Sequence, residues 1–245
     1  MKRVYTLGLG IILTTCACTR GSGRTIVLPG AGSAPASSPD PPVPGALWIE
    51  RFDEPQLTWQ APMGNTQEQI SKVYSVQRED GLHFLHARHD CRPEMHCPPF
   101  LHFGKKLDPN PPSLERIGAL RWKWRVLEHP KNPEHPWQDV AASVYVIIKV
   151  PGAISAGKGF RFGWLARPGP KGTSRRGIAR IALREEPATR EWRAESVDVC
   201  ARFREIFGPC EGQKLHYIGV ATEADDTRSV AIADYTDFEL IASGP

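Results

Sequence analysis

Several residue types that support chemistry occur in this sequence, but no two of them form a recognisable catalytic pair. Glycoside hydrolysis needs two carboxylates held a fixed distance apart, and Glu185, Glu186, Glu191 and Glu195 are available, with Glu191 and Glu195 flanking Trp192. Nothing in their spacing marks a pair, and a solvated strand edge explains them equally well. The chain has no G-x-S-x-G elbow, Walker loop or HExxH motif.

The cysteines support a more definite prediction. Cys91, Cys97, Cys200 and Cys210 are an even set, which predicts two disulfides in an oxidising compartment. Pairing of near neighbours, Cys91 with Cys97 and Cys200 with Cys210, is the simplest choice, although spacing leaves crossed pairing open. His89 and His96 beside the first pair offer zinc-type ligands. Their spacing matches no familiar zinc pattern, so we favour a disulfide-closed loop.

Acidic and aromatic side chains suggest two kinds of binding site. Asp225, Asp226 and Asp237 near the end of the chain could ligate calcium, although Asp is also a common turn-capping residue. No other cofactor is expected. Aromatic rings can stack on the flat, partly apolar faces of sugars. Among the tryptophans, Trp137, in a Pro-rich loop, and Trp192, after a polar run, are the candidates for exposed platforms of this kind, although a place at the edge of the core is the simpler interpretation of both.

The N-terminus predicts export and attachment to a membrane. Lys2 and Arg3 precede an apolar run that is too short to span a bilayer. Small residues then lead to Cys18, as in a bacterial lipobox, although Thr15 stands where Leu is usual. We therefore expect a signal peptide and lipid-anchor cysteine over residues 1–18, facing the periplasm or exterior of a bacterial cell envelope. The alternative is plain secretion with cleavage nearby.

Composition divides the rest of the chain into a tether and one domain. Residues 19–45 are rich in Gly, Pro, Ala and Ser and predict a flexible linker. Residues 46–245 are long enough for one ordinary domain. The formal net charge of +4 falls to +2 once Lys2 and Arg3 are removed, which is too mild to indicate nucleic-acid binding. The sequence leaves the oligomeric state open.

Alternation of apolar and polar residues dominates the domain. Leu120, Trp122, Trp124 and Val126 share one face of an expected strand, and a longer strand from 139 to 150 is apolar on both faces. Asp80 and Gly81 separate two extended runs and predict a hairpin. Only residues 198–208 favour a helix, with Gly208 as its terminator. About ten strands and one short helix predict an all-β fold, a two-sheet antiparallel β-sandwich or jelly roll.

Three blocks of the chain resemble the bacterial domain-of-unknown-function family 3047. The blocks are LRWKWRV followed by QDVAASVYVIIKV, then EWRAESVDVCARFREIFG, and finally IGVATEADDTRSVAIADYTDFEL. With GFRFGWLA, the resemblance covers roughly residues 48–240. Val197, Arg202 and Phe203 depart from the family's pattern, as does the Glu223–Asp226 segment. The resemblance implies a sandwich exported to the envelope, and it implies no reaction.

These observations lead to a ranked set of functions. The first is an envelope-anchored sandwich that binds a ligand, namely a glycan or another envelope polymer. The second is a polysaccharide hydrolase or lyase, because the same folds host both. The third is a scaffold protein without a small ligand. An enzyme requires convergent carboxylate, His or Tyr groups in a concave face, a glycan binder requires accessible rings, and a scaffold requires a broad apolar patch.

Overall fold

A computed structural model describes most of the C-terminal four-fifths of the chain. The described residues are 44–53, 59–61, 67–98, 102–107, 109–149, 157–169, 172–173 and 177–244. The expected signal peptide, Cys18 and nearly all of the linker lie outside them. No helix in the described part is long and apolar enough to cross a membrane.

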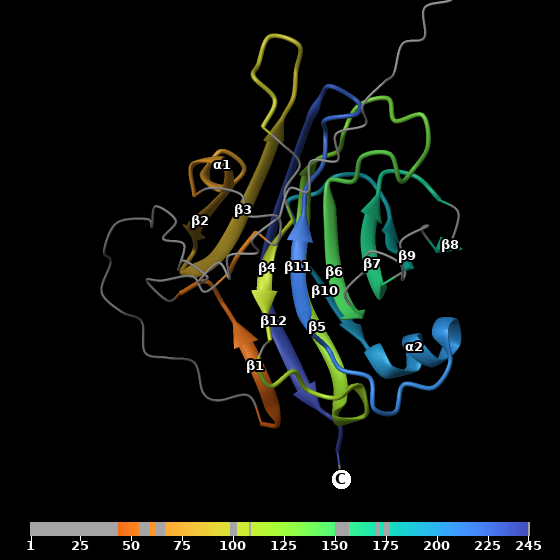
Figure 1. Ribbon diagram of the computed structural model, residues 1–245. Helices are drawn as coiled ribbons and strands as arrows, with labels where there is room; N and C mark the ends of the chain where they lie inside the picture. The colour runs from red at the N-terminus through yellow and green to blue at the C-terminus, as the bar shows by residue number, and fades with distance from the viewer. Residues whose placement is uncertain are drawn as a thin grey trace, which may run out of the picture.

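Two six-stranded sheets pack face to face, which confirms the predicted β-sandwich (Figure 1). The first sheet has the order β10-β5-β12-β3-β2, and β1 also pairs with β12. Its strands are β1 (Ala46–Glu50), β2 (Tyr74–Glu79), β3 (Leu82–Asp90), β5 (Ile117–Glu128), β10 (Arg193–Val197) and β12 (Val230–Ala242).

The second sheet has the order β4-β11-β6-β7-β9-β8. Its strands are β4 (Phe103–Lys106), β6 (Ala142–Lys149), β7 (Lys158–Leu165), β8 (Gly172–Thr173), β9 (Ile178–Glu185) and β11 (Tyr217–Ala221). The pairing of β7 with β9 is parallel, whereas we had expected antiparallel sheets throughout. The chain between these two strands includes β8, which pairs with the far side of β9, so β9 runs in the same direction as β7.

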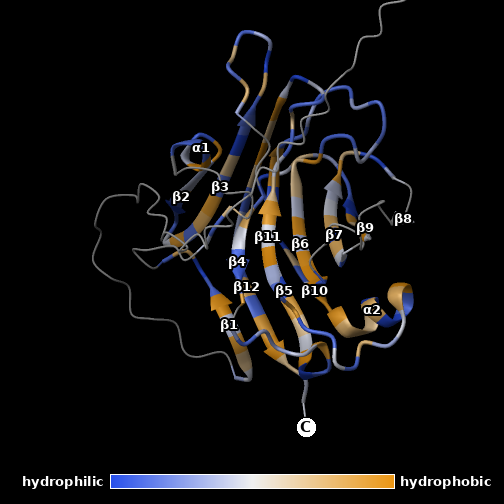
Figure 2. Ribbon diagram, viewed as in Figure 1, coloured by the Kyte–Doolittle hydropathy of each residue, from blue (hydrophilic) through white to orange (hydrophobic). Residues whose placement is uncertain are grey.

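The core lies between the sheets and is rich in aromatic rings. Trp122 and Trp124 of β5 are fully buried and pack against Phe162 and Trp164 of β7. The apolar face predicted for residues 120–126 is therefore the inner face of the first sheet. Figure 2 shows hydrophobic colour concentrated on the strands and α2, with hydrophilic colour on the connecting loops.

Local signals in the sequence place the hairpin and the helix correctly. Asp80 and Gly81 join β2 to β3 with φ of 49° and 84°, as a two-residue type I′ turn requires. The helix α2 (Val199–Phe207) begins after Asp198, whose side chain accepts a hydrogen bond from the Ala201 N–H at 2.8 Å. It ends at Gly208, with φ of 93°. The short helices α1 (Gln67–Ser71) and η1 (Leu114–Arg116) were not predicted.

Both predicted disulfides are present, Cys91–Cys97 and Cys200–Cys210. The second joins α2 to the turn that follows it. Pairing of near neighbours is therefore confirmed and crossed pairing is excluded.

Candidate functional site: a basic groove at the open edge of the sandwich

The two long edges of the sandwich differ in how the sheets meet. At the β9–β10 edge, Arg184 of the second sheet pairs with Glu195 of the first at 2.5 Å. Glu195 also accepts a hydrogen bond from the indole N–H of Trp124 at 2.9 Å. We call this the closed edge, because an ion pair and a core tryptophan join the sheets there.

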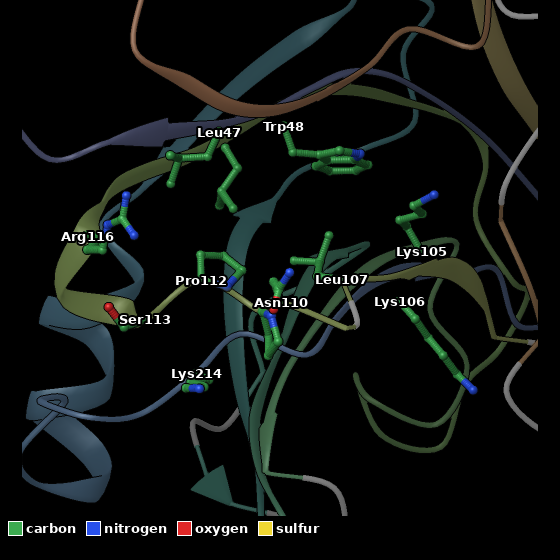
Figure 3. A pocket seen from close by; sticks show the side chains of 12 residues that line it. Leu47, Trp48, Lys105, Lys106, Leu107, Asn110, Pro112, Ser113, Arg116 and Lys214 are labelled. Carbon is green, nitrogen blue, oxygen red and sulfur yellow. The ribbon is translucent and has the colours of Figure 1, made fainter.

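The opposite edge, between β1 and β4, contains a cavity of about 580 Å³ and is called here the basic groove (Figure 3). β1 and β12 supply one wall, and β4 with the segment that follows it supplies the other. The described residues that line it are Leu47, Trp48, Lys105, Lys106, Leu107, Asn110, Pro111, Pro112, Ser113, Arg116, Lys214 and Leu240.

Two stretches of extended chain hold one wall of the groove in place. The Leu107 N–H donates to the His216 carbonyl at 3.0 Å, and the Leu215 N–H donates to the Pro112 carbonyl at 2.9 Å. Lys106 is in register with Tyr217, and Ser113 forms a bridge with Lys214. The prolines suit this wall, because their missing N–H groups leave no unsatisfied donor facing the cavity.

The groove is strongly positive. Lys105, Lys106, Arg116 and Lys214 line it, and none of its described lining residues is acidic. Lys106, Arg116 and Lys214 are exposed and form no ion pair within the described ranges. Lys105 lies close enough to Glu50 to oppose the rise that burial causes in the pKa of that carboxyl group. Such a concentration of one charge raises the local concentration of anions.

Trp48 is the aromatic platform of the groove. It is half-buried, it packs against the core, and its ring centroid lies 6.5 Å from that of Phe238. In Figure 3 the indole ring lies over the cavity, between Leu47 and Lys105. Trp48 is not distinguishable in the sequence from a core residue, because one tryptophan in an extended segment carries no local sign of exposure.

The tryptophans that the sequence nominated have other roles. Trp137 is 3% exposed, so the expectation of an exposed platform is wrong. Its ring packs over Gly163, where a side chain would occupy its place, and lies 5.5 Å from the Arg161 guanidinium. Trp192 is half-buried on the outer face of the first sheet, where Arg125 stacks on it at 4.6 Å.

A polar network accompanies Trp192 on this outer face. The buried Asp234 accepts from Arg125 at 2.7 Å and contacts His86 Nδ1 at 2.6 Å. Arg125 also pairs with Glu79 at 2.6 Å. Arg125 is 8% exposed, so the polar face expected for β5 is solvated only in part. In this network the charged groups of Arg125, Asp234 and Glu79 are paired with one another.

A second buried ion pair lies on the outer face of the second sheet. Arg161 pairs with Glu223 and donates to the Ser143 hydroxyl at 3.0 Å. Burial raises the pKa of Glu223, while the charge of Arg161 opposes that rise. No local pattern in the sequence indicates that Glu223 pairs with Arg161, because the two residues are 62 positions apart.

The structure does not bring the predicted calcium ligands together as one set. Asp225 and Asp226 lie in the turn before β12, and burial, then the charges of Asp139 and Asp225, raises the pKa of Asp226. Asp237 instead pairs with Lys123 at 2.8 Å and with Arg51 at 3.9 Å. A calcium site stays a prediction from sequence.

His89, Cys91 and Cys97 form the one group of described residues whose possible metal-ligand atoms lie within reach of one another. The two cysteines are joined as a disulfide. The Ala224 N–H donates to His89 Nδ1 at 3.0 Å, so the ring proton belongs on Nε2, which donates to the Pro98 carbonyl at 3.0 Å. A metal would need the lone pair that this proton occupies. The geometry supports the disulfide-closed loop.

Glu191 and Glu195, the carboxylates considered for hydrolysis, do not converge on a cavity. Glu195 is engaged at the closed edge by Arg184 and Trp124. Glu191 is exposed and pairs with Arg193 at 2.9 Å. Exposed large apolar side chains in the described part are limited to Leu47, Met95 and Ile206. The broad apolar patch that a scaffold would need is therefore not found there.

Comparison with known proteins adds little to this description. No protein-family model matches the chain, and no curated protein matches its sequence. Among solved structures, endoglucanase 3 from family GH12 of Trichoderma harzianum matches with a TM-score of 0.41 and 10% identity over 69% of this chain and 83% of that one. Endoglucanase cel12A from Rhodothermus marinus gives 0.42 and 13% over 69% and 85%. The xyloglucanase domain of NopAA from Sinorhizobium fredii gives 0.38 and 10% over 69% and 96%. Likeness at this level does not establish a shared activity.

Proposed function

We propose that this protein is a non-catalytic binding module for an acidic glycan of the cell envelope, held in the basic groove. The single observation that carries the proposal is the composition of the groove. Four cations and a half-buried tryptophan line a cavity of about 580 Å³, without an acidic residue among its described lining. Cations bind the carboxylate or phosphate groups of such a ligand, and the ring stacks on a sugar face.

Two further features favour an extracytoplasmic glycan over nucleic acid. Two disulfides are typical of proteins in an oxidising compartment. The groove also offers one aromatic ring, whereas proteins that hold single-stranded nucleic acid stack successive bases on several. An acidic glycan therefore fits the groove, and the oxidising compartment that the disulfides indicate, better than nucleic acid does.

The test is binding of the full chain to polygalacturonate, measured by calorimetry. We expect binding that weakens as the salt concentration rises, because ions screen exposed charges. Fully methyl-esterified polygalacturonate, which carries no charge, should bind far more weakly. Single-stranded poly-dT serves as the competing polyanion, and preference for poly-dT would replace the glycan proposal.

Matched variants test the location. The triple variant Lys106→Gln, Arg116→Gln, Lys214→Gln removes three groove charges, and Lys72→Gln, Arg78→Gln, Lys131→Gln removes three exposed charges elsewhere. Only the first should abolish binding. Equal losses in both would show that net charge, not the groove, drives association. Release of new reducing ends during incubation would make the protein an enzyme.

The attachment to the envelope is a part of this proposal that rests on the sequence. Cys18 would carry the lipid, and the 19–45 segment would let the sandwich reach polymers near the membrane. A Cys18→Ser variant, expressed in a bacterium that processes lipoproteins, is expected in the soluble fraction. Continued membrane association of that variant would contradict the lipid anchor.

A further inference from the structure

The cations of the basic groove fall into two pairs, one at each end of the ribbon that forms its wall. Lys105 and Lys106 belong to β4, whereas Arg116 and Lys214 lie beyond the Pro-rich turn. Figure 3 shows the first pair on one side of the cavity and the second on the other, with Trp48, Leu107 and Pro112 between them. The groove therefore has two charged ends and an apolar middle.

The register of the ribbon gives the separation of the two ends. Lys106 lies opposite Tyr217, and Ser113 lies opposite Lys214. Lys214 lies three positions before Tyr217 in extended chain, so the backbone of the two ends is roughly 10 Å apart at about 3.3 Å per residue. The side chains of the two pairs lie on opposite sides of the cavity in Figure 3, so one carboxylate does not reach both pairs in this arrangement. Two acidic groups on the same ligand can do so if a sugar unit lies between them.

We propose that the groove selects acidic oligosaccharides long enough to place one anionic group at each end, with a sugar ring over Trp48 between them. This inference rests on the proposed function and specifies its ligand class. Once one anionic group is bound, the same ligand molecule holds the other anionic group close to the cations of the second end. Binding at both ends therefore raises the affinity by more than the added charge alone would give. A monosaccharide acid occupies one end at a time.

The experiment compares galacturonic acid and its linear oligomers of two, three and four units, with the full chain. We expect a step in affinity, of about tenfold or more, at the length that first spans both ends. Lys106→Gln and Arg116→Gln, one from each end, should each weaken the spanning oligomer about fivefold. Lys131→Gln, at an exposed position in the loop that follows β5, is the matched control.

The outcomes separate this inference from the function on which it rests. If no acidic saccharide of any length binds, the proposed function fails. If oligomers bind but affinity rises smoothly with length, or if only one end variant weakens binding at every length, the two-ended site is overturned and the acidic-glycan function stands. A step in affinity that both end variants remove, and that Lys131→Gln leaves unchanged, supports the inference.

Discussion

At the scale of single residues, the environment of each tryptophan decides its role. Trp48 is half-buried at an edge where the two sheets do not close on each other, so one part of its ring contributes to the core and another faces the groove. Trp137 and Trp192 have an Arg guanidinium against their rings. A ring that a cation of the same chain already covers has less surface for a ligand.

We expect Trp48→Ala to weaken binding of polygalacturonate by about twofold to thirteenfold, the range that stacking energies of about 0.5–1.5 kcal/mol give. Trp192→Ala, which removes a half-buried ring from a different face, is the control and should leave binding unchanged. Calorimetric titration of each variant measures the effect. Weakening by Trp192→Ala alone would move the site to the outer face of the first sheet.

Asp90 is a second residue whose environment allows a prediction. Hydrogen bonds from Arg92, and then from Arg88, lower the pKa of Asp90 well below its usual range. A carboxyl group with a lowered pKa in the folded state stabilises the protein above its unfolded pKa of about 3.9, and this contribution is lost as the pH falls through the folded value. Asp90→Asn should therefore lower the melting temperature at pH 7. The difference from the unchanged protein should shrink between about pH 5 and pH 2, and a difference independent of pH would contradict this role.

At the scale of elements, each disulfide cross-links a segment outside the sheets: the loop after β3 and the helix α2 with its following turn. The Cys200–Cys210 bond ties α2 to the turn before β11, and the chain beyond that turn carries Lys214 into the groove. The Cys91–Cys97 bond closes a loop at the end of β3, and His89 links this loop to Ala224.

Removal of the second disulfide by Cys200→Ala with Cys210→Ala should lower the free energy of unfolding by about 2–3 kcal/mol, because a closed loop of this length restricts the unfolded chain. Denaturant unfolding measures the change. Glycan binding at a temperature where the variant remains folded should fall only modestly. Complete loss of binding in a folded variant would mean that α2 positions the groove directly.

At the scale of the whole molecule, the two edges of the sandwich join the sheets differently. Arg184 and Glu195 form an ion pair at the closed edge. At the other edge Glu50 of β1 accepts a hydrogen bond from Trp59 at 2.9 Å, and the neighbouring Gln60 pairs with Gly104 of β4, so the sheets are joined there next to the groove. The cavity lies where the sheets diverge, and cations from both sides of the Pro-rich turn converge on it. The binding surface is thus a consequence of how the two sheets meet.

This difference between the edges predicts the behaviour of two glutamates. Glu195→Ala leaves Arg184 and the Trp124 indole N–H without their shared partner, so we expect a loss of about 2–3 kcal/mol in the free energy of unfolding. Glu191→Ala, at an exposed position, should change it by less than about 0.5 kcal/mol. Both variants should bind polygalacturonate normally. If the Glu195→Ala variant is fully folded and still fails to bind, the ligand contacts lie at the closed edge.

The sequence by itself determined the class of fold, the hairpin at Asp80–Gly81 and the limits of α2. Each of these follows from residues that are close together in the chain, because alternation, turn chemistry and capping are local. The tertiary structure alone decided the site. Its lining comes from distant parts of the chain, since 166 positions separate Trp48 from Lys214. Trp137 is buried in a small cluster outside the main core, because Gly163 of β7 leaves room for its ring. Contacts of this kind depend on which strands become neighbours, and local patterns of apolar and polar residues do not encode that choice.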